Sequence, residues 1–456
     1  MTDRFDISAV VDASPRTVSS PHPSRLDDLP RLARDPAFHG MTATQFLGAF
    51  NDNLFKQLVL LICLDLGGAA RGGFLQMVAQ GLFAIAFVLF SGFAGFLSDL
   101  TSKRTIVVLA KVAEIAIMLL GMGALFLGAV EPAWMLPGLL AVLFLMGTQS
   151  AFFGPSKYGI LPEMFRGRDL PRVNGMVQMT TFAAIIFGTA LAGYAKEWFQ
   201  ADLWVVSAMC VGIAVLGTAT SLWVRKTPVA HTGLRFRLSS LAINAQTWNM
   251  LRSDRPLFGV LLISAVFWFV GGVMLPAVNE FGRFQLHVGD GRTSLLASCM
   301  GVGIAIGCAV AGKASHERVS FRLVHLGAWG MVATLAAMAG LGLAPLSVAA
   351  LEWLARLDLM LAGFFAGLFV VPLQVFMQAR PPEDQKGRMI GAMNLINWIG
   401  IVLAAGFFGL CTWAFGEQAA LARAGVDAPV SWTFAVLALV LLPVALFYHP
   451  REESLE

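Results

Sequence analysis

Hydrophobic residues in this chain fall in runs of about 20, separated by short polar segments, from Met41 to Phe447. Each run is long enough to cross the roughly 30 Å hydrocarbon core of a bilayer as a helix. Helices are expected because each one satisfies its own backbone hydrogen bonds inside lipid. The pattern predicts twelve spans, at 41–66, 73–98, 105–129, 133–154, 172–195, 202–224, 256–280, 293–313, 321–345, 357–378, 389–414 and 430–448.

Composition supports this interpretation, because 57% of the residues are hydrophobic and only 13% are charged. Soluble domains average about 25% charged residues. Most of the 32 Lys and Arg residues lie in alternate connections, beginning with the N-terminal segment, which predicts that both termini and the central loop 225–255 are cytoplasmic. This bias also accounts for the net charge of +4, so no nucleic-acid partner is expected.

The ends of the chain and its cysteines and histidines predict little chemistry. Residues 1–40 lack the apolar core of a signal peptide and are expected to form a flexible cytoplasmic tail, or, as an alternative, a partner-binding arm. The five Cys fall in apolar runs without C-x-x-C spacing, and the His residues form no cluster with Asp or Glu. We therefore expect no metal site, no cofactor and no enzymatic activity. The sequence has no G-x-x-x-x-G-K-[ST] loop, so ATP is not expected to drive the protein directly.

An internal repeat divides the chain into two halves. The stretch RVNGMVQMTTF from Arg172 aligns with RMIGAMNLINW from Arg388, an offset of 216, which places Gln178 opposite Asn394 and Thr181 opposite Asn397. Both stretches open the fifth span of their half. We therefore predict an all-α membrane protein with six-helix halves at 41–224 and 256–448, a cytoplasmic linker at 225–255 and a tail at 449–456. Parallel halves are the arrangement of the major facilitator superfamily.

The loop after the second span resembles a motif of that superfamily. GFLSDLTSKR matches G-x-x-x-D-[RK]-x-G-[RK]-[RK] at Gly95, Asp99, Lys103 and Arg104, whereas Leu100 and Ser102 depart from it. The resemblance implies that these residues gate the cytoplasmic side, with Asp99 contacting neighbouring helix ends. The alternative is an ordinary basic inner loop.

Three further stretches resemble the bacterial lysophospholipid transporter family: QFLGAFNDNLFK, FFGPSKYGILPEMF and GFFAGLFVVPLQVFMQ. The resemblance implies movement of lysophospholipids from the outer to the inner leaflet of the inner membrane, where an acyltransferase restores the second chain. This chain shows no H-x-x-x-x-D acyltransferase motif, so a separate partner enzyme is expected. Several family members carry a basic residue in the seventh span, but here that span has Pro276 and no Lys or Arg before Arg283.

Polar residues inside the first span are candidate site residues. Asp52 is about 11 residues into its span, roughly 16 Å deep, where a charge costs at least about 2.5–3.5 kcal/mol. Lys56 is at i+4, so the two side chains are predicted to pair on one helical face, which Gln45 and Gly48 extend towards the cytoplasm. The pair is interpreted either as structural or as a site for a headgroup or a cation. Lys111 and Glu114, at i and i+3 in the third span, are expected to be structural.

The repeat offset indicates what faces these residues. Asn51, Asp52 and Asn53 correspond to Phe267, Trp268 and Phe269, so a cavity with one polar and one apolar wall is predicted, which suits an amphiphile. The alternative is that the aromatic residues only pack against neighbouring helices. Lys157, at the inner end of the fourth span, is expected to meet a phosphate or to snorkel to lipid headgroups. The remaining predicted site residues are polar and lie on the tenth and eleventh spans: Gln374, Gln378, Asn394 and Asn397.

These observations predict a secondary transporter that moves lysophospholipids between leaflets, with membrane lipid as its surroundings. The alternative is a proton- or cation-coupled antiporter of small solutes or drugs, with Asp52 as the coupling residue. In either case transport draws on the substrate gradient, an ion gradient or removal of the product.

Overall fold

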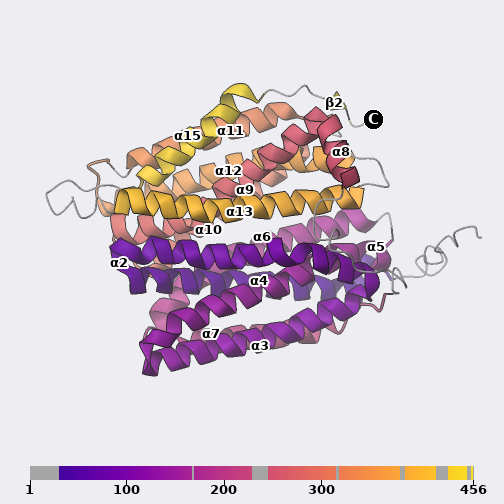
Figure 1. Ribbon diagram of the computed structural model, residues 1–456, viewed down its shortest axis with the longest axis horizontal. Helices are drawn as coiled ribbons and strands as arrows, with labels where there is room; N and C mark the ends of the chain where they lie inside the picture. The colour runs from indigo at the N-terminus through magenta and orange to yellow at the C-terminus, as the bar shows by residue number, and fades with distance from the viewer. Residues whose placement is uncertain are drawn as a thin grey trace, which may run out of the picture.

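The computed structural model describes residues 30–166, 169–227, 245–314, 318–341, 343–380, 386–416, 430–448 and 453–454. Nearly all of them are helical, and the helices run side by side along one direction (Figure 1). Within these described ranges, eleven helical segments are long and apolar enough to cross a membrane, and the apolar helix Trp432–Phe447 is shorter. The described helices therefore agree closely with the twelve predicted spans.

The first half of the bundle, called the N-half here, contains the helices before the central linker. Its elements are η2 (Leu32–Arg34), α2 (Pro36–Leu100), α3 (Lys103–Val130), η3 (Pro132–Trp134), α4 (Met135–Gly159), α5 (Leu161–Met164), α6 (Leu170–Trp198) and α7 (Trp204–Ser221). Within α2, Gly68 has φ 54°, which only glycine adopts readily, and the chain reverses there between the spans Pro36–Ala69 and Arg71–Ser98. The long element α2 is therefore two spans.

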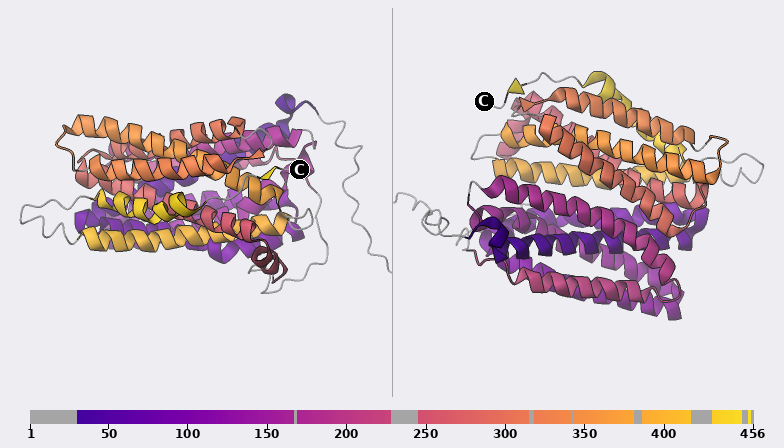
Figure 2. Two further views of the ribbon diagram at one scale, coloured as in Figure 1. Left: turned by 90° about the horizontal axis from the view of Figure 1, so that it is seen from above. Right: turned by 180° about the vertical axis from the view of Figure 1, so that it is seen from behind.

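The second half, called the C-half, follows the linker and lies beside the N-half, as the right view of Figure 2 shows. Its elements are α8 (Ala245–Ser253), α9 (Arg255–Glu280), η6 (Phe281–Gln285), α10 (Asp290–Ala314), β1 (Arg318–Val319), α11 (Phe321–Leu341), α12 (Val348–Ala379), α13 (Lys386–Gly416), α15 (Trp432–Phe447) and β2 (Glu453–Ser454). The two-residue strands pair with each other. Three parts of the predicted organisation lie outside the described residues: 1–29 of the N-terminal tail, 228–244 of the linker, and all of the C-terminal tail except 453–454.

Two helices begin earlier in the structure than the sequence predicted. Helix α12 begins at Val348 and not near 357, since Glu352 and Arg356 are both inside it and bind each other. Glu352 also pairs with Arg292 of α10, so these charges are satisfied between helices. Helix α2 begins at Pro36, where Asp35 caps it by accepting from Ala37 N at 2.9 Å.

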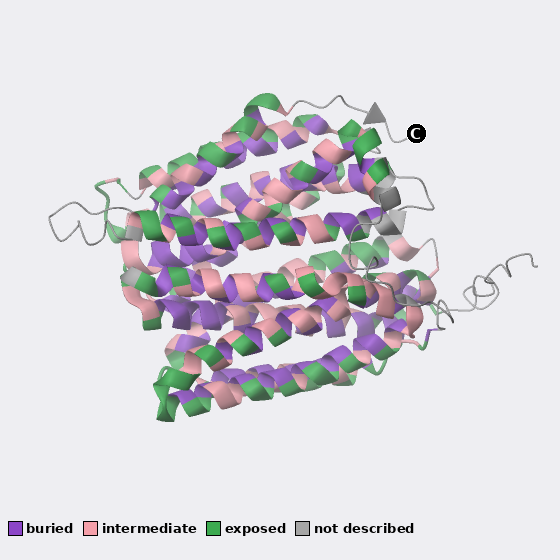
Figure 3. Cartoon of the chain, in the orientation of Figure 1, coloured by how far each residue is buried: buried purple, intermediate pink, exposed green. Residues whose placement is uncertain are grey.

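Each half has its own hydrophobic core, and large apolar side chains also cover the outside of the bundle. Phe126 is 58% exposed and Leu439 is 65% exposed, although both are strongly apolar. Figure 3 shows exposed positions along the outer helices α3 and α15. In water such a surface would favour association, whereas in a bilayer it contacts lipid. The chain is therefore a multi-pass membrane protein.

We name the two ends of the bundle for orientation. The N-terminal face is the end where α2 begins and where α5 and α8 lie, on the right in Figure 1. The opposite face is the end that holds Gly68, η3 and η6.

Candidate substrate site

Asp52 lies near the middle of the span Pro36–Ala69 and faces α4. Ser150 Oγ donates a 2.7 Å hydrogen bond to Asp52 Oδ2. The other oxygen, Oδ1, is buried and has no hydrogen-bond partner among the described residues. The carboxylate therefore has a free acceptor at mid-depth in the membrane.

The predicted ion pair between Asp52 and Lys56 is wrong for the part of the chain that the structure describes. Lys56 Nζ lies 5.2 Å from the centre of the Phe83 ring, which is a cation–π contact with the second span. The i+4 spacing placed both residues on one helical face, but it could not reveal that Ser150 and Phe83, on other segments, would be their partners.

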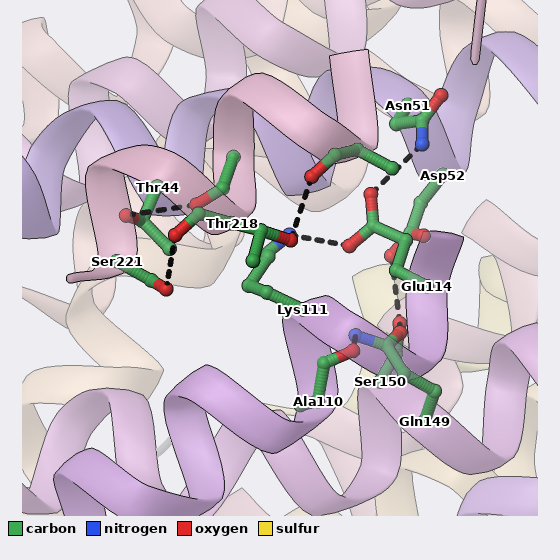
Figure 4. A network of polar contacts seen from close by, with 12 residues as sticks. Thr44, Asn51, Asp52, Ala110, Lys111, Glu114, Gln149, Ser150, Thr218 and Ser221 are labelled. Carbon is green, nitrogen blue, oxygen red and sulfur yellow. Dashed lines mark hydrogen bonds and ion pairs between the residues drawn. The ribbon is translucent and has the colours of Figure 1, made fainter. Parts of the chain in front are cut away.

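A buried polar network lies behind Asp52 (Figure 4). Asn51 Nδ2 donates to Glu114 Oε1 at 2.8 Å, and the other Glu114 oxygen pairs with Lys111. Lys111 is only 1% exposed. This arrangement joins α2 to α3, so Asn51 serves the network, and the expected pairing of Lys111 with Glu114 is confirmed.

A second polar layer lies closer to the N-terminal face. Lys157 Nζ donates to Gln45 Oε1 at 3.1 Å and lies 4.7 Å from the centre of the Tyr158 ring. Gln45 in turn donates to Val177 O and to Thr180 Oγ1, so α2, α4 and α6 meet there. Gln45 precedes Asp52, and Lys157 follows Ser150, by seven residues each, or about 10 Å along a helix. Asp52 and Lys157 therefore mark two successive levels on the same side of the bundle.

The other predicted polar residues are not gathered with Asp52. Asn53 donates to Ala49 O of its own helix at 2.7 Å, and Asn397 is buried and accepts from Ser264 at 3.1 Å. Gln374 is half-buried and Asn394 is exposed. The side chain of Gln378 lies outside what the structure describes.

The three aromatic residues of α9 differ in their surroundings. Phe267 stacks on Phe369 at 6.0 Å, and Phe269 meets Phe407 edge-on at 5.1 Å, both inside the C-half. These two contacts agree with the packing alternative. Trp268, the counterpart of Asp52 in the repeat, is 36% exposed and is the aromatic residue that could face a substrate.

The motif after the second span ties elements of the N-half together. Lys103 forms an ion pair with Glu163 of α5, and Arg104 donates to Val224 O at 2.7 Å and to Leu222 O at 3.1 Å. Gly95 has open space around its Cα, and the Asp99 side chain lies outside what the structure describes. The gating role of these residues therefore stays a prediction.

The opposite face is closed by contacts between the halves. Asp65 of α2 accepts from Lys196 of α6 and from Arg283 of η6, and both cations also bind Asp290 of α10. Below them Gln57 donates to Asn279 at 2.8 Å, and Asn279 donates to Gln76 at 3.0 Å. Ion pairs and buried amides of both halves thus hold this end together.

An aromatic stack continues the interface toward the middle of the bundle. Phe87 of α2 lies flat on Trp398 of α13, with ring centres 3.7 Å apart and planes 10° from parallel. Phe83, whose ring makes the cation–π contact with Lys56, meets Trp398 edge-on with ring centres 6.3 Å apart. Lys56 therefore belongs to a contact between the halves.

Sequence reasoning did not select several residues that the structure brings into these sites. These are Ser150, Gln57, Gln76 and Asn279, which are polar residues inside apolar helices, and only the polarity itself could have drawn attention to them. Their partners are on other helices, at separations that no local spacing rule covers.

Two six-helix halves, joined at one face and carrying polar residues at mid-depth, define a secondary transporter. The family model of the Major Facilitator Superfamily matches residues 41–405. The chain belongs to this superfamily.

Curated relatives of this chain are named as lysophospholipid transporters. "Lysophospholipid transporter LplT" of Klebsiella pneumoniae subsp. pneumoniae is 28% identical over 372 residues, which is 80% of this chain and 86% of the relative. "Lysophospholipid transporter LplT" of Salmonella paratyphi B has the same identity and coverage. The resemblance to this group in the first, fourth and tenth spans is thus confirmed over most of the chain.

Solved structures share the fold at low sequence identity. A D-xylose–proton symporter superposes with a TM-score of 0.68 at 13% identity, covering 91% of this chain and 98% of its own. A bacterial homologue of the lysosomal transporter Spinster, in an inward-facing and unoccupied conformation, gives 0.67 at 13% identity, with coverage of 91% and 96%. These likenesses establish the fold alone.

Proposed function

We propose that this protein moves lysophospholipids from the outer to the inner leaflet of a bacterial inner membrane. The observation that carries the proposal is the free, buried Oδ1 of Asp52 at mid-depth, which can accept from the ammonium of an ethanolamine headgroup. The relatives named lysophospholipid transporter support the same substrate class.

The two polar levels suggest an order of events. The headgroup first meets Asp52 and then Lys157, about 10 Å nearer the N-terminal face, where the ammonium of Lys157 can take over the phosphate as a point charge. One acyl chain gains about 0.8 kcal/mol per CH₂ relative to water, so it must stay in an apolar environment during the crossing. Trp268 is the candidate to contact that chain.

Transport is tested by uptake of labelled lysophosphatidylethanolamine into cells that lack their own transporter. A diacyl phospholipid and a cationic drug serve as comparisons. We expect uptake of the lysolipid and little movement of the two-chained lipid, because a second chain must fit the same cleft. Drug efflux without lysolipid uptake would favour the antiporter, in which Asp52 binds a coupling proton or cation.

The role in reacylation requires a separate enzyme, since residues for acyl transfer were not found in the sequence. In cells that contain a lysophospholipid acyltransferase, we expect the imported label to appear in diacyl lipid. In matched cells without the acyltransferase it should accumulate as lysolipid. If the label stays in lysolipid in both strains, the product is not delivered to that enzyme.

Direction depends on which face is cytoplasmic, and the charge bias favours the N-terminal face. In a variant without native cysteines, Ala33→Cys at the N-terminal face and Ala201→Cys at the opposite face are both exposed. An impermeant maleimide added to spheroplasts should label only Ala201→Cys. Labelling of Ala33→Cys instead would reverse the proposed orientation.

A further inference from the structure

Glu280 is a carboxylate buried between the halves near the opposite face. It is the last residue of α9 and is 7% exposed. A Cβ on Gly73 of α2 would collide with the Glu280 carboxylate and with the methyl group of Thr412 of α13, so the carboxylate lies against the backbone of the N-half. Glycine at position 73 leaves the space that the carboxylate occupies.

Glu280 has no ion pair and no hydrogen bond from any residue that the structure describes. Two cations of this region, Lys196 and Arg283, already bind Asp65 and Asp290. A third, Arg71, is exposed and forms no ion pair with Glu280 among the described residues. The charges where α12 begins are also paired, because Glu352 binds Arg292 of α10 and Arg356 of its own helix. At this end of the elements around Glu280, the charged and titratable side chains are Asp65 and Arg71 on α2, Lys196 and Glu197 on α6, Arg283 on η6, Asp290 and Arg292 on α10 and Cys411 on α13.

An ionised carboxylate in this position would have little contact with water and no partner among the described residues. Burial without compensation strongly disfavours the charged form of such a group, and the neutral acid avoids that cost. Separation of the halves at this face would instead expose the carboxylate to water, where ionisation is favoured. The two conformations therefore differ in their affinity for a proton at this residue.

We propose that Glu280 is a proton-binding site whose occupancy is linked to closure of the opposite face. Closing the face transfers one proton from the adjacent solution to the Glu280 carboxylate, and opening releases it. A ligand that binds one of two conformations more tightly shifts the population toward that conformation. Acid on this side of the membrane therefore holds the transporter closed there, and alkali opens it.

This device acts on the conformational equilibrium and does not depend on which substrate is carried. Linkage of one proton changes the ratio of open to closed protein by up to about tenfold per pH unit. The test therefore measures conformation without substrate, so its failure would leave the proposed lysolipid transport untouched.

The experiment uses spin labels at Ala201→Cys in the N-half and Leu343→Cys in the C-half, both exposed on the opposite face. The cysteine-free background is otherwise full length and is placed in lipid nanodiscs. Distances are measured by electron–electron double resonance between pH 5 and pH 9. We expect a longer distance to gain population as the pH rises, and E280Q to keep the short distance throughout, because its amide stays neutral.

Three further variants distinguish the role of Glu280 from general damage to the protein and from the titration of other groups. E280D retains a carboxylate and should retain the pH response even if its midpoint moves. E197Q removes another carboxylate of this face, which accepts from Gly291 N at 2.9 Å, and should respond like the parent. H287Q removes the exposed histidine of the same face and should also leave the response in place. A parent without a pH response, or an E280Q variant with the full response, would overturn the proposal.

Discussion

At the scale of single residues, the buried charged side chains differ in whether they have a partner. Asp52 has one oxygen bonded to Ser150 and one without a partner among the described residues, whereas the charges of Lys111 and Glu114 pair with each other and Glu114 also accepts from Asn51. The charge of Asp52 is therefore open to a ligand, whereas the charges of Lys111 and Glu114 are already paired. We therefore expect Asp52 to serve substrate binding, and Lys111 and Glu114 to serve stability.

Asp52→Asn should abolish uptake of lysophosphatidylethanolamine while the protein still inserts. The substitution keeps the volume and the contact with Ser150 but removes the charge that binds the ammonium. A hydrogen bond to a charged group contributes about 1.5–3 kcal/mol, so apparent affinity should fall by roughly ten- to hundredfold. Lys56→Met should have a smaller effect, because Lys56 contacts Phe83. Uptake at the parental rate by Asp52→Asn would remove Asp52 from the site.

Lys111→Met should destabilise the N-half by about 3–5 kcal/mol, because it leaves Glu114 charged, buried and without its cation. The double variant Lys111→Met with Glu114→Gln removes both charges and should recover most of the loss. Thermal unfolding in detergent measures both, with Lys56→Met as the control for loss of a half-buried lysine. A double variant as unstable as the single one would show that the pair is not a unit.

At the scale of elements, hydrophobic periodicity predicted the spans well, because lipid requires long apolar helices. The third span, expected at 105–129, is Lys103–Val130. The method failed where charges pair between helices, as at Glu352 with Arg292, since the sequence does not show that a charge is neutralised. The same limit explains Asp52 and Lys56: local spacing gives the face of a helix but not the partner across from it.

Helices α10 and α12 pack closely through glycine, and this contact can be tested. A Cβ on Gly303 would collide with the carbonyl of Met360, so Gly303→Val should force the helices apart and lower the yield of folded protein. Gly312→Val on the same helix is the matched control, because nothing lies within 4 Å of a Cβ there. Folded yield is measured by size-exclusion chromatography. Equal yields for both variants would contradict the close packing of α10 on α12.

For the whole molecule, the repeat at an offset of 216 predicted two halves, but it could not predict which face they close. That choice rests on contacts between halves, such as Asp65 with Arg283 and Gln57 with Asn279, which no comparison of one half with the other contains. Alternating access by rocking of the halves requires these contacts to break. The interface is therefore expected to be a moving part.

Disulfides across the interface should arrest the transporter. A Cβ on Gly81 of α2 would lie 3.5 Å from the Cβ of Ala405 of α13, and one on Gly301 of α10 would lie 3.9 Å from the Cβ of Ile186 of α6. Both separations suit a disulfide, which needs Cβ atoms about 3.5–4.5 Å apart. In the cysteine-free background, Gly81→Cys with Ala405→Cys and Ile186→Cys with Gly301→Cys should each oxidise readily, lose uptake and regain it after reduction.

The matched control for these disulfides is a pair inside one half, because a bond that does not cross the interface should not prevent rocking. A Cβ on Gly217 of α7 would lie 3.7 Å from the Cβ of Leu47 of α2, so Leu47→Cys with Gly217→Cys should also oxidise. This bond joins two helices of the same half. The oxidised variant should therefore take up lysolipid at the same rate as the same variant in its reduced form. Mass spectrometry confirms each bond before uptake is measured. If the oxidised pairs across the interface transport as fast as this control, the halves do not separate along α2–α13 and α6–α10 during the cycle.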